Sequence, residues 1–228
     1  MIKIAPSILN CDFINLKESI RLIEQAGADM LHLDIMDGHF VPNISFGPGV
    51  VNSIKGITKL PLDVHLMIEN PEKFISVFAE AGAKIITVHS ETCINLREGI
   101  GAIKKEGLQV GVALNPQTSL DSLLDHLNQI DMALLMTVNP GYGGQKFISS
   151  VLPKIAELRD YISRSRLDVD IQVDGGIDLE TAQSVIDSGA NILVAGEYIF
   201  GSPDPRKAIE DLRRVCELSQ RRNTSKPR

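Results

Sequence analysis

Two histidines and two aspartates stand near the C-terminal ends of three short apolar segments. His32 and Asp34 are two residues apart in MLHLDIM, His65 lies in PLDVHLMI, and Asp174 ends VDIQVD. Because residues i and i+2 of a strand point to the same face, His32 and Asp34 share one face. The four side chains offer two nitrogen and two oxygen donors without a thiolate, a set that suits Zn²⁺, Fe²⁺, Mn²⁺ or Co²⁺.

A strand histidine is more often a hydrogen-bonded core residue than a ligand, and that is the structural alternative here. Burying several ionisable groups in one place is costly unless a metal or a partner compensates for their charge. We therefore expect His32, Asp34, His65 and Asp174 to hold one divalent metal ion per subunit, whose identity the sequence does not fix. Asp63 shares a face with His65 but lies deeper, so we expect it to support the site from behind.

Three glycine-bearing segments follow the last apolar runs and predict a phosphate site. They read NPGYGGQ over 139–145, DGGI over 174–177 and AGE over 195–197. Glycines allow backbone N–H groups to approach a dianion closely. Tight turns alone would explain any one of these segments, but three neighbouring loops favour phosphate. Lys146 is the only basic residue in these loops, so we expect backbone amides to make most of the contacts.

The positions of these residues depend on an alternation of short apolar runs with longer amphipathic ones. Strands are expected at 2–9, 30–36, 61–68, 84–90, 109–114, 132–138, 169–174 and 191–196. Helices are expected to begin at Asp12, Asn70, Ser119, Asp178 and Asp204, and to end at Gly27, Gly82, Gly107 and Gly189. Eight such units predict an α/β fold, a single-domain TIM (β/α)8 barrel, whose active sites form at strand C-terminal ends.

An open doubly wound sheet is the alternative fold. Its dinucleotide-binding version needs a glycine-rich turn after the first strand, and the corresponding segment, LNCD at 9–12, has no glycine. The barrel is therefore the stronger prediction.

Composition narrows the class of protein. The 23 basic and 29 acidic side chains give a net charge of −6, which disfavours nucleic acid and anionic membranes as partners. No apolar run approaches the roughly 18 residues of a membrane helix, and the N-terminus lacks a signal-peptide pattern. Three cysteines without CxxC spacing fit a reducing cytosol. We expect a cytoplasmic homo-oligomer, with a barrel domain over 1–219 and a polar, basic, disordered tail over 220–228.

Five segments resemble the ribulose-phosphate 3-epimerase family, and the resemblance runs from about residue 4 to about residue 212. They are 5–9, 32–43, 62–67, 136–145 and 173–177, of which the second and fourth are highly specific together. The resemblance implies a TIM barrel, a divalent metal and an isomerase. The implied reaction interconverts D-ribulose 5-phosphate and D-xylulose 5-phosphate in the pentose phosphate pathway.

The resemblance also implies roles for individual residues. His32, Asp34, His65 and Asp174 fall on the metal ligands of the family, and Asp34 and Asp174 also on its acid/base pair. The implied substrate-binding residues are Ser7, Met36, His65, Met67, Met136, Gly141, Tyr142, Gly143, Gly144, Gly175, Gly176, Gly196 and Glu197. Glu197 departs from the family, which usually has a small hydroxyl residue there. A carboxylate beside a phosphate is repulsive, so its side chain turns away or phosphate binding is weakened.

Inverting C3 of a 2-ketose requires removal of a proton from one face and return of a proton to the other. We expect Asp34 and Asp174 to serve as base and acid in reciprocal roles, while a metal stabilises the enediolate. Three alternatives remain open. One is 3-epimerisation of D-allulose 6-phosphate, for which Glu197 leaves room. Another is decarboxylation, which needs a lysine that these strand ends lack. The third is a catalytically impaired sugar-phosphate-binding barrel.

Overall fold

The structure is a computed structural model that describes residues 2–224. Its strands form one parallel sheet in the order β1-β8-β7-β6-β5-β4-β3-β2, and a bridge between Ser7 and His32 brings β1 beside β2. The strands are β1 Lys3–Pro6, β2 Leu31–Met36, β3 Leu62–Met67, β4 Ile85–His89, β5 Gln109–Leu114, β6 Met132–Met136, β7 Asp170–Asp174 and β8 Ile192–Ala195. The predicted TIM barrel is confirmed.

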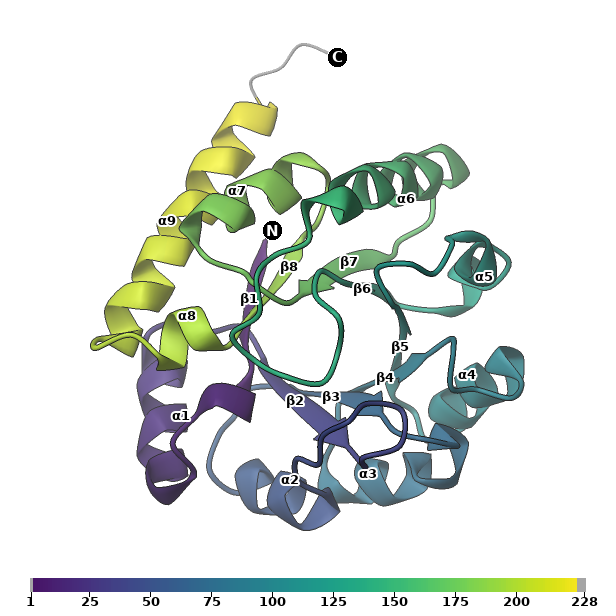
Figure 1. Cartoon of the computed structure of the whole chain (residues 1–228), viewed down its shortest axis with the longest axis horizontal. Helices are drawn as coiled ribbons and strands as arrows, with labels where there is room; N and C mark the ends of the chain where they lie inside the picture. The colour runs from purple at the N-terminus through teal and green to yellow at the C-terminus, as the bar shows by residue number, and fades with distance from the viewer. Residues whose placement is uncertain (1, 225–228) are drawn as a thin grey trace.

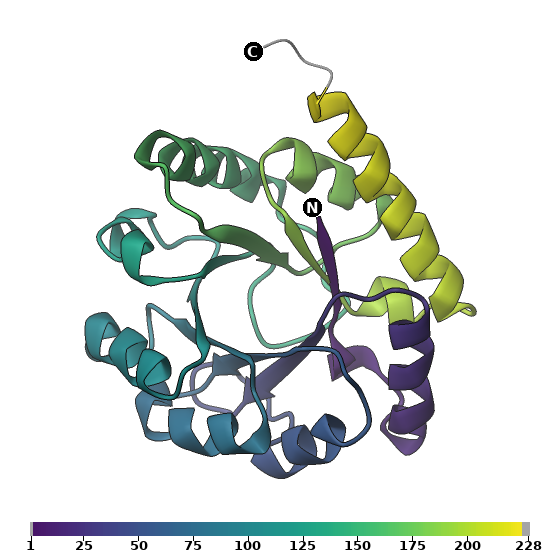
Figure 2. The ribbon, with the colours of Figure 1, turned by 180° about the vertical axis from the view of Figure 1, so that it is seen from behind.

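Helices form a ring around the strands, as Figures 1 and 2 show from the two sides. They are α1 Leu16–Gln25, α2 Pro48–Lys55, α3 Ile75–Ala81, α4 Leu96–Lys105, α5 Asp121–Leu124, α6 Leu152–Ser165, α7 Leu179–Asp187, α8 Glu197–Phe200 and α9 Pro205–Thr224. The connection from β6 to α6 passes across the barrel mouth in Figure 1. This long connection carries one of the predicted phosphate-binding segments.

Local chemistry explains where several helices begin and end. The Asp178 side chain accepts hydrogen bonds from the N–H groups of Glu180 and Thr181, which caps α7. Asp12 caps a short 3-10 turn before α1 by accepting from the N–H of Ile14. At the other end, the glycines predicted to terminate helices all have a positive φ, namely Gly27, Gly82, Gly107 and Gly189. Glycine adopts this conformation without the steric penalty of a β-carbon.

The first strand is shorter than predicted, and the reason lies in one side chain. The prediction of 2–9 includes Ser7, whose hydroxyl accepts a hydrogen bond from the N–H of Leu9 and starts a 3-10 turn over Ile8–Asn10. The strand therefore ends at Pro6. This turn leaves the Ser7 side chain at the barrel mouth.

The barrel buries apolar groups on both faces of its strands, but its interior also holds polar ones. Strand residues such as Leu33, Val64 and Val88 pack outward against the helices in the main core. A smaller apolar cluster that includes Met132 fills part of the interior. Further along the strands the interior residues are polar and fully or almost fully buried, namely Ser7, His32, Asp34, Asp63, His65, Thr87, His89 and Gln172. A polar set of this kind, placed inside a barrel, needs a functional explanation.

The C-terminal boundary differs from the prediction of a disordered tail over 220–228. Helix α9 continues to Thr224, so residues 220–224 are helical. Arg222 donates a hydrogen bond to Gln183 of α7, which holds this end of α9 against its neighbour. Residues 225–228 of the predicted tail lie outside the described residues. Within residues 2–224, no helix is long and apolar enough to cross a membrane.

Candidate active site

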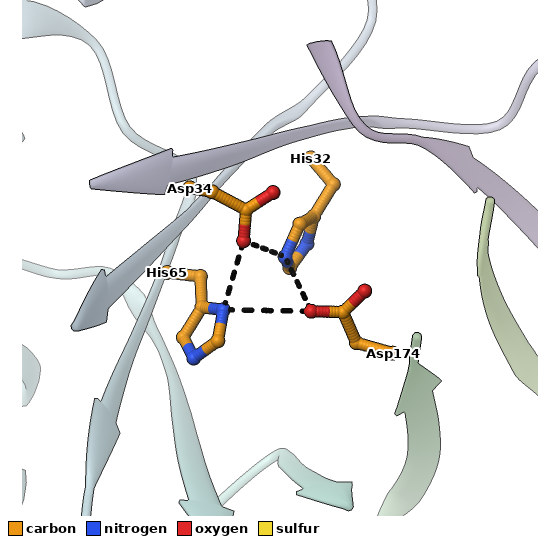
Figure 3. A group of neighbouring side chains, drawn as sticks. All are labelled: His32, Asp34, His65 and Asp174. Atoms are coloured by element: carbon orange, nitrogen blue, oxygen red, sulfur yellow. Dashed lines mark hydrogen bonds and ion pairs between the residues drawn. The ribbon is translucent and has the colours of Figure 1, made fainter. Parts of the chain in front are cut away.

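Four ionisable side chains from three strands converge at the barrel mouth (Figure 3). One ligand atom from each of His32, Asp34, His65 and Asp174 lies within 4.8 Å of the others. Asp34 Oδ1 is 3.3 Å from His32 Nε2 and 3.2 Å from His65 Nδ1. Asp174 Oδ2 is 3.9 Å from each of the same two nitrogens. The structure therefore brings together all four predicted metal ligands.

The orientation of His32 fits a metal ligand. Its Nδ1 lies 2.7 Å from Asp63 Oδ2, and Asp63 accepts a further hydrogen bond of 2.7 Å from Gln172 Nε2. A carboxylate at Nδ1 draws the proton to that nitrogen and leaves the Nε2 lone pair facing Asp34 and Asp174. Among the described residues, this buried Nε2 has no hydrogen-bond partner. A divalent cation would satisfy it. The expected support of the site by Asp63 stays a prediction, with which its hydrogen bond to His32 agrees.

The environment within the cluster gives its two carboxyl groups different pKa values. Burial opposes ionisation of Asp34, but the charge of His32, 3.3 Å away, and the hydrogen bond with His65 outweigh it and lower the pKa of Asp34. Burial and the neighbouring Asp34 carboxylate raise the pKa of Asp174 to about 7. Two carboxyl groups whose environments push their pKa values apart are suited to act as proton acceptor and proton donor.

The two histidines also differ. Burial alone would lower the pKa of His32, but the Asp34 and Asp63 carboxylates outweigh it and raise that pKa well above its usual value. A cation that binds His32 Nε2 must therefore displace a proton from it. Burial lowers the pKa of His65 to about 4, despite its hydrogen bond with Asp34. The His65 ring is thus neutral near pH 7, which is the form that binds a metal.

Hydrogen bonds hold Asp34 in place from two further segments. The Ser7 hydroxyl donates to Asp34 Oδ2 over 2.5 Å. The Ser45 hydroxyl, in the connection after β2, donates to the Asp34 backbone carbonyl over 2.5 Å. Ser7 thus contacts Asp34, the carboxylate that is predicted to act on the substrate. Ser7 also lines the cavity, so the predicted contact between Ser7 and the substrate is compatible with the structure.

A cavity of about 440 Å³ opens beside the cluster. Its wall includes most of the predicted substrate-binding residues, namely Ser7, Met36, Met67, Met136, Gly141, Tyr142, Gly143, Gly144, Gly175, Gly176, Gly196 and Glu197. Asp34 and Asp174 also line it, whereas His65 is fully buried. The three methionines are 4% exposed or less and form an apolar part of the wall. One space therefore joins the acidic pair to the glycine-bearing loops.

The glycines in these loops are needed for packing as well as for access. Gly175 has φ +117° and Gly176 has φ +66°, a region that side chains rarely adopt. A β-carbon on Gly175 would lie 2.3 Å from Val138 Cγ2, and one on Gly176 would lie 2.6 Å from the backbone nitrogen of Phe147. The alternative of tight turns is therefore part of the explanation. Gly175 and Gly176 both line the cavity.

Glu197 does not turn away from the predicted phosphate region. Its carboxylate accepts a hydrogen bond of 2.8 Å from Asn10 Nδ2 and lines the cavity. A β-carbon on Gly144 would lie 4.0 Å from Glu197 Oε2, so the carboxylate stands directly beside this loop. Lys146 also lines the cavity and is the cation available there to offset the charge.

Known proteins with similar sequences agree with this geometry. A model of the ribulose-phosphate 3 epimerase family matches residues 3–200. The chain is 51% identical to "Ribulose-phosphate 3-epimerase" of Bacillus subtilis (strain 168), covering 93% of this chain and 99% of that protein. It is 47% identical to the protein of the same name from Synechocystis sp., covering 93% of each.

The chain belongs to the ribulose-phosphate 3-epimerase family. The predicted family and enzyme class, an epimerase, are thereby confirmed. A crystal structure of 3-hexulose-6-phosphate synthase from Salmonella typhimurium matches with a TM-score of 0.72 at 18% identity, covering 96% of this chain and 100% of that one. At that identity the likeness shows the fold alone. The roles given to individual residues of this family member stay predictions.

Two side chains that lie behind His65 in this epimerase were not predicted from the sequence. His89 ends β4, and its Nε2 lies 2.9 Å from His65 Nε2. Glu91 follows the strand, and its Oε2 lies 3.3 Å from His89 Nδ1. The sequence does carry a signal for His89, which is a third strand histidine beside His32 and His65. It lies in the run KIITVHS, at the C-terminal end of a predicted strand. Its link to His65 depends on how β3 and β4 pair, which composition and periodicity do not specify.

Proposed function

We propose that this chain interconverts D-ribulose 5-phosphate and D-xylulose 5-phosphate by a metal-dependent two-base proton transfer at C3. The single observation that carries this proposal is that Asp34 and Asp174, from two different strands, line the same cavity with their carboxylates close together. The family supports the substrate class, and interconversion of these two pentose phosphates would be a step of the pentose phosphate pathway.

His32, Asp34, His65 and Asp174 would hold the divalent cation, since their ligand atoms already lie within 4.8 Å of one another. When bound, such a cation polarises a ketone and stabilises negative charge on oxygen. Zn²⁺, Fe²⁺, Mn²⁺ and Co²⁺ all suit this donor set. The residues of the chain supply the proton chemistry.

In one direction, one of the two carboxylates removes the C3 proton of the ketose, and the electron pair of the C–H bond delocalises into the carbonyl as an enediolate. The other carboxyl group then delivers a proton to the opposite face of C3, which inverts that centre. The reverse reaction exchanges the two roles. Ser7 keeps the Asp34 carboxylate oriented through its 2.5 Å hydrogen bond.

Two further parts of the cavity support binding. Met36, Met67 and Met136 would exclude water from the reacting carbons, because their side chains are apolar and adaptable. The loops at 141–144, 175–176 and 196–197 would bind the phosphate mainly through backbone amides. Glu197 would weaken that binding through its charge and so sets the limit on phosphate affinity.

The experiment compares purified protein treated with a chelator and then resupplied with Zn²⁺, Mn²⁺ or Co²⁺. D-Ribulose 5-phosphate and D-allulose 6-phosphate are tested in parallel. We expect pentose turnover to be lost with the metal and restored with at least one ion. Turnover of the hexose phosphate alone would favour the alternative epimerase, and binding without turnover of either sugar would favour the impaired barrel.

We also propose a cytoplasmic homo-oligomer that acts on a small molecule. Apolar side chains near the barrel mouth support assembly, because Ile14 is 92% exposed and the ring of Phe13, 47% exposed, packs on Phe46 at 5.7 Å. Light scattering after size-exclusion chromatography tests the assembly. A mass of one chain across the concentrations used would contradict it.

A further inference from the structure

A hydrogen-bonded path leads from His65 away from the cavity. It runs from His65 Nε2 to His89 Nε2 over 2.9 Å and from His89 Nδ1 to Glu91 Oε2 over 3.3 Å. His65 and His89 are both fully buried, and their rings stack at 5.0 Å with an interplanar angle of 25°. The Phe40 ring packs against the His89 ring, with 4.6 Å between the two ring centroids. The path is therefore held in a fixed geometry.

The path has a direction because its last member only accepts. An ionised Glu91 has no proton to donate, so His89 Nδ1 carries the hydrogen that joins them. The neutral His89 ring then has its lone pair on Nε2, and that lone pair must accept the hydrogen on His65 Nε2. His65 is left with a bare Nδ1, the nitrogen that faces Asp34 and Asp174 in the cluster. Without a cation, the Asp34 carboxylate competes for this arrangement, because it accepts a hydrogen bond of 3.2 Å when Nδ1 carries the hydrogen.

We propose that Glu91 and His89 are positioning residues that fix the tautomer of His65, so that its Nδ1 lone pair is free to bind the divalent cation. This inference rests on the proposed function, because it concerns the metal site described there. It assigns to Glu91 the task that Asp63 performs for His32, with one imidazole placed between carboxylate and ligand. Neither Glu91 nor His89 touches the substrate cavity.

Glu91 is itself anchored, which makes it a reliable end to the path. Its Oε1 accepts hydrogen bonds from the backbone N–H of Asn115 over 2.8 Å and the hydroxyl of Thr118 over 2.5 Å. Lys154 Nζ donates to the carbonyls of the same two residues, over 3.2 and 2.6 Å. The Glu91 side chain is 21% exposed. The loop after β5, held by Lys154 of α6, thus determines which of its oxygens faces His89.

These anchors make Glu91→Gln a sharp test. The amide oxygen of glutamine takes the place of Oε1, because the backbone N–H of Asn115 can only donate there. The Ser90 hydroxyl, which donates to Oε2 over 3.2 Å, can instead accept from an NH₂ group. Its NH₂ group then faces His89 Nδ1 and donates to it. The path reverses, so that His89 Nε2–H donates to His65 Nε2 and the hydrogen of His65 moves to Nδ1. A protonated Nδ1 has no lone pair for a metal, although the size of the side chain has not changed.

The first readout is the affinity for Co²⁺, measured by competition with a chromophoric chelator. Loss of a hydrogen bond that orients a ligand typically costs 10–100-fold in metal affinity, and we expect E91Q to fall by about that factor. Glu98→Gln is the matched control, since Glu98 lies on α4 with its Oε1 accepting from Asn95 over 2.9 Å. E98Q removes the same charge nearby and should change the affinity by less than about twofold.

The second readout is the tautomer itself, from ¹⁵N chemical shifts and long-range ¹H–¹⁵N couplings of the His65 and His89 rings in Zn²⁺-loaded protein, where Asp34 no longer competes for a hydrogen on His65 Nδ1. We expect the hydrogen on Nε2 of His65 and on Nδ1 of His89 in the wild type, and on Nε2 of His89 in E91Q. The wild-type spectrum tests the inference even if E91Q does not fold. A hydrogen on Nε2 of wild-type His89, or E91Q with wild-type affinity for Co²⁺, overturns it.

The outcomes separate this inference from the proposed function. A wild-type protein that binds Co²⁺ and turns over D-ribulose 5-phosphate, beside an E91Q variant with equal Co²⁺ affinity, overturns the inference alone. A wild-type protein that binds no Co²⁺ overturns the proposed metal site and the inference with it.

Discussion

Asp34 and Asp174 meet at one point of the barrel mouth although their strands do not pair. Asp34 stands on β2, which pairs with β3, and Asp174 ends β7, which pairs with β6 and β8. Closing the sheet into a barrel brings their ligand atoms within 4.8 Å. The proposed two-base transfer needs the two carboxylates on different faces of one substrate carbon, and their origin on different strands allows this.

This relationship predicts complementary defects in two variants. Asp34→Asn and Asp174→Asn, each saturated with metal, should lose about 10²–10⁴-fold in epimerisation, the usual worth of a general acid or base. Each remaining carboxylate should still exchange the C3 proton of one epimer with solvent. The variants should therefore label opposite epimers with deuterium, which NMR in D₂O detects. Labelling of the same epimer by both, or normal epimerisation by either, would contradict the two-base assignment.

Glu197 should weaken phosphate binding, because its carboxylate lines the cavity beside Gly144. Glu197→Gln removes the charge and keeps an oxygen that can accept from Asn10. Relief of about 0.5–1.5 kcal/mol of repulsion should lower KM for the sugar phosphate roughly 3–10-fold, with kcat nearly unchanged. Raising the salt concentration should shrink this difference.

The control for this prediction is Glu157→Gln, an exposed carboxylate on α6 away from the cavity wall. It should leave KM unchanged. An unchanged or higher KM in E197Q would mean that the carboxylate is screened, or that it contributes to binding.

Glu91 should make the protein more stable near neutral pH than in acid. Burial disfavours its charged form, but hydrogen bonds from His89, Thr118 and Asn115 outweigh this and lower its pKa to about 2. A folded-state pKa below the unfolded value contributes stability that is present above about pH 4.5 and is lost as pH falls toward 2. Urea unfolding at pH 7 and pH 4 measures this contribution.

Allowing for its partial exposure, Glu91 should account for about 0.5–1 kcal/mol of the loss between these pH values. Glu91→Gln should show a correspondingly smaller loss, whereas Glu98→Gln should behave as the wild type. An equal loss in E91Q and wild type would show that the Glu91 hydrogen bonds do not stabilise the folded state.

Gly176 should tolerate no side chain. Its φ of +66° and the 2.6 Å approach to the Phe147 backbone nitrogen mean that Gly176→Ala must displace a loop at the cavity. We expect a loss of about 1–3 kcal/mol in the free energy of unfolding, together with a raised KM. Gly101→Ala, in open space within α4, should instead add about 0.5–1 kcal/mol. Equal stability of G176A and wild type would contradict the packing account.

The sequence allowed the barrel and the metal cluster to be predicted because both follow from short-range periodicity. Alternation places His32 and Asp34 on one face, and the strand-helix alternation places the strand ends together. The contact of His65 with His89 could not be predicted, because it depends on the register between β3 and β4 and on side-chain rotamers. The direction of Glu197 was likewise open, since it is decided by the hydrogen bond with Asn10.

The most direct test of the central claim follows the C3 hydrogen during turnover of D-ribulose 5-phosphate by metal-loaded protein in D₂O. Removal of the C3 proton by one of Asp34 and Asp174, and delivery of a solvent-exchanged one by the other, predicts that the D-xylulose 5-phosphate formed carries deuterium at C3 from its first turnovers. D-Xylulose 5-phosphate that retains the original hydrogen at C3 would contradict a two-base mechanism, and the absence of any turnover would contradict the proposed substrate.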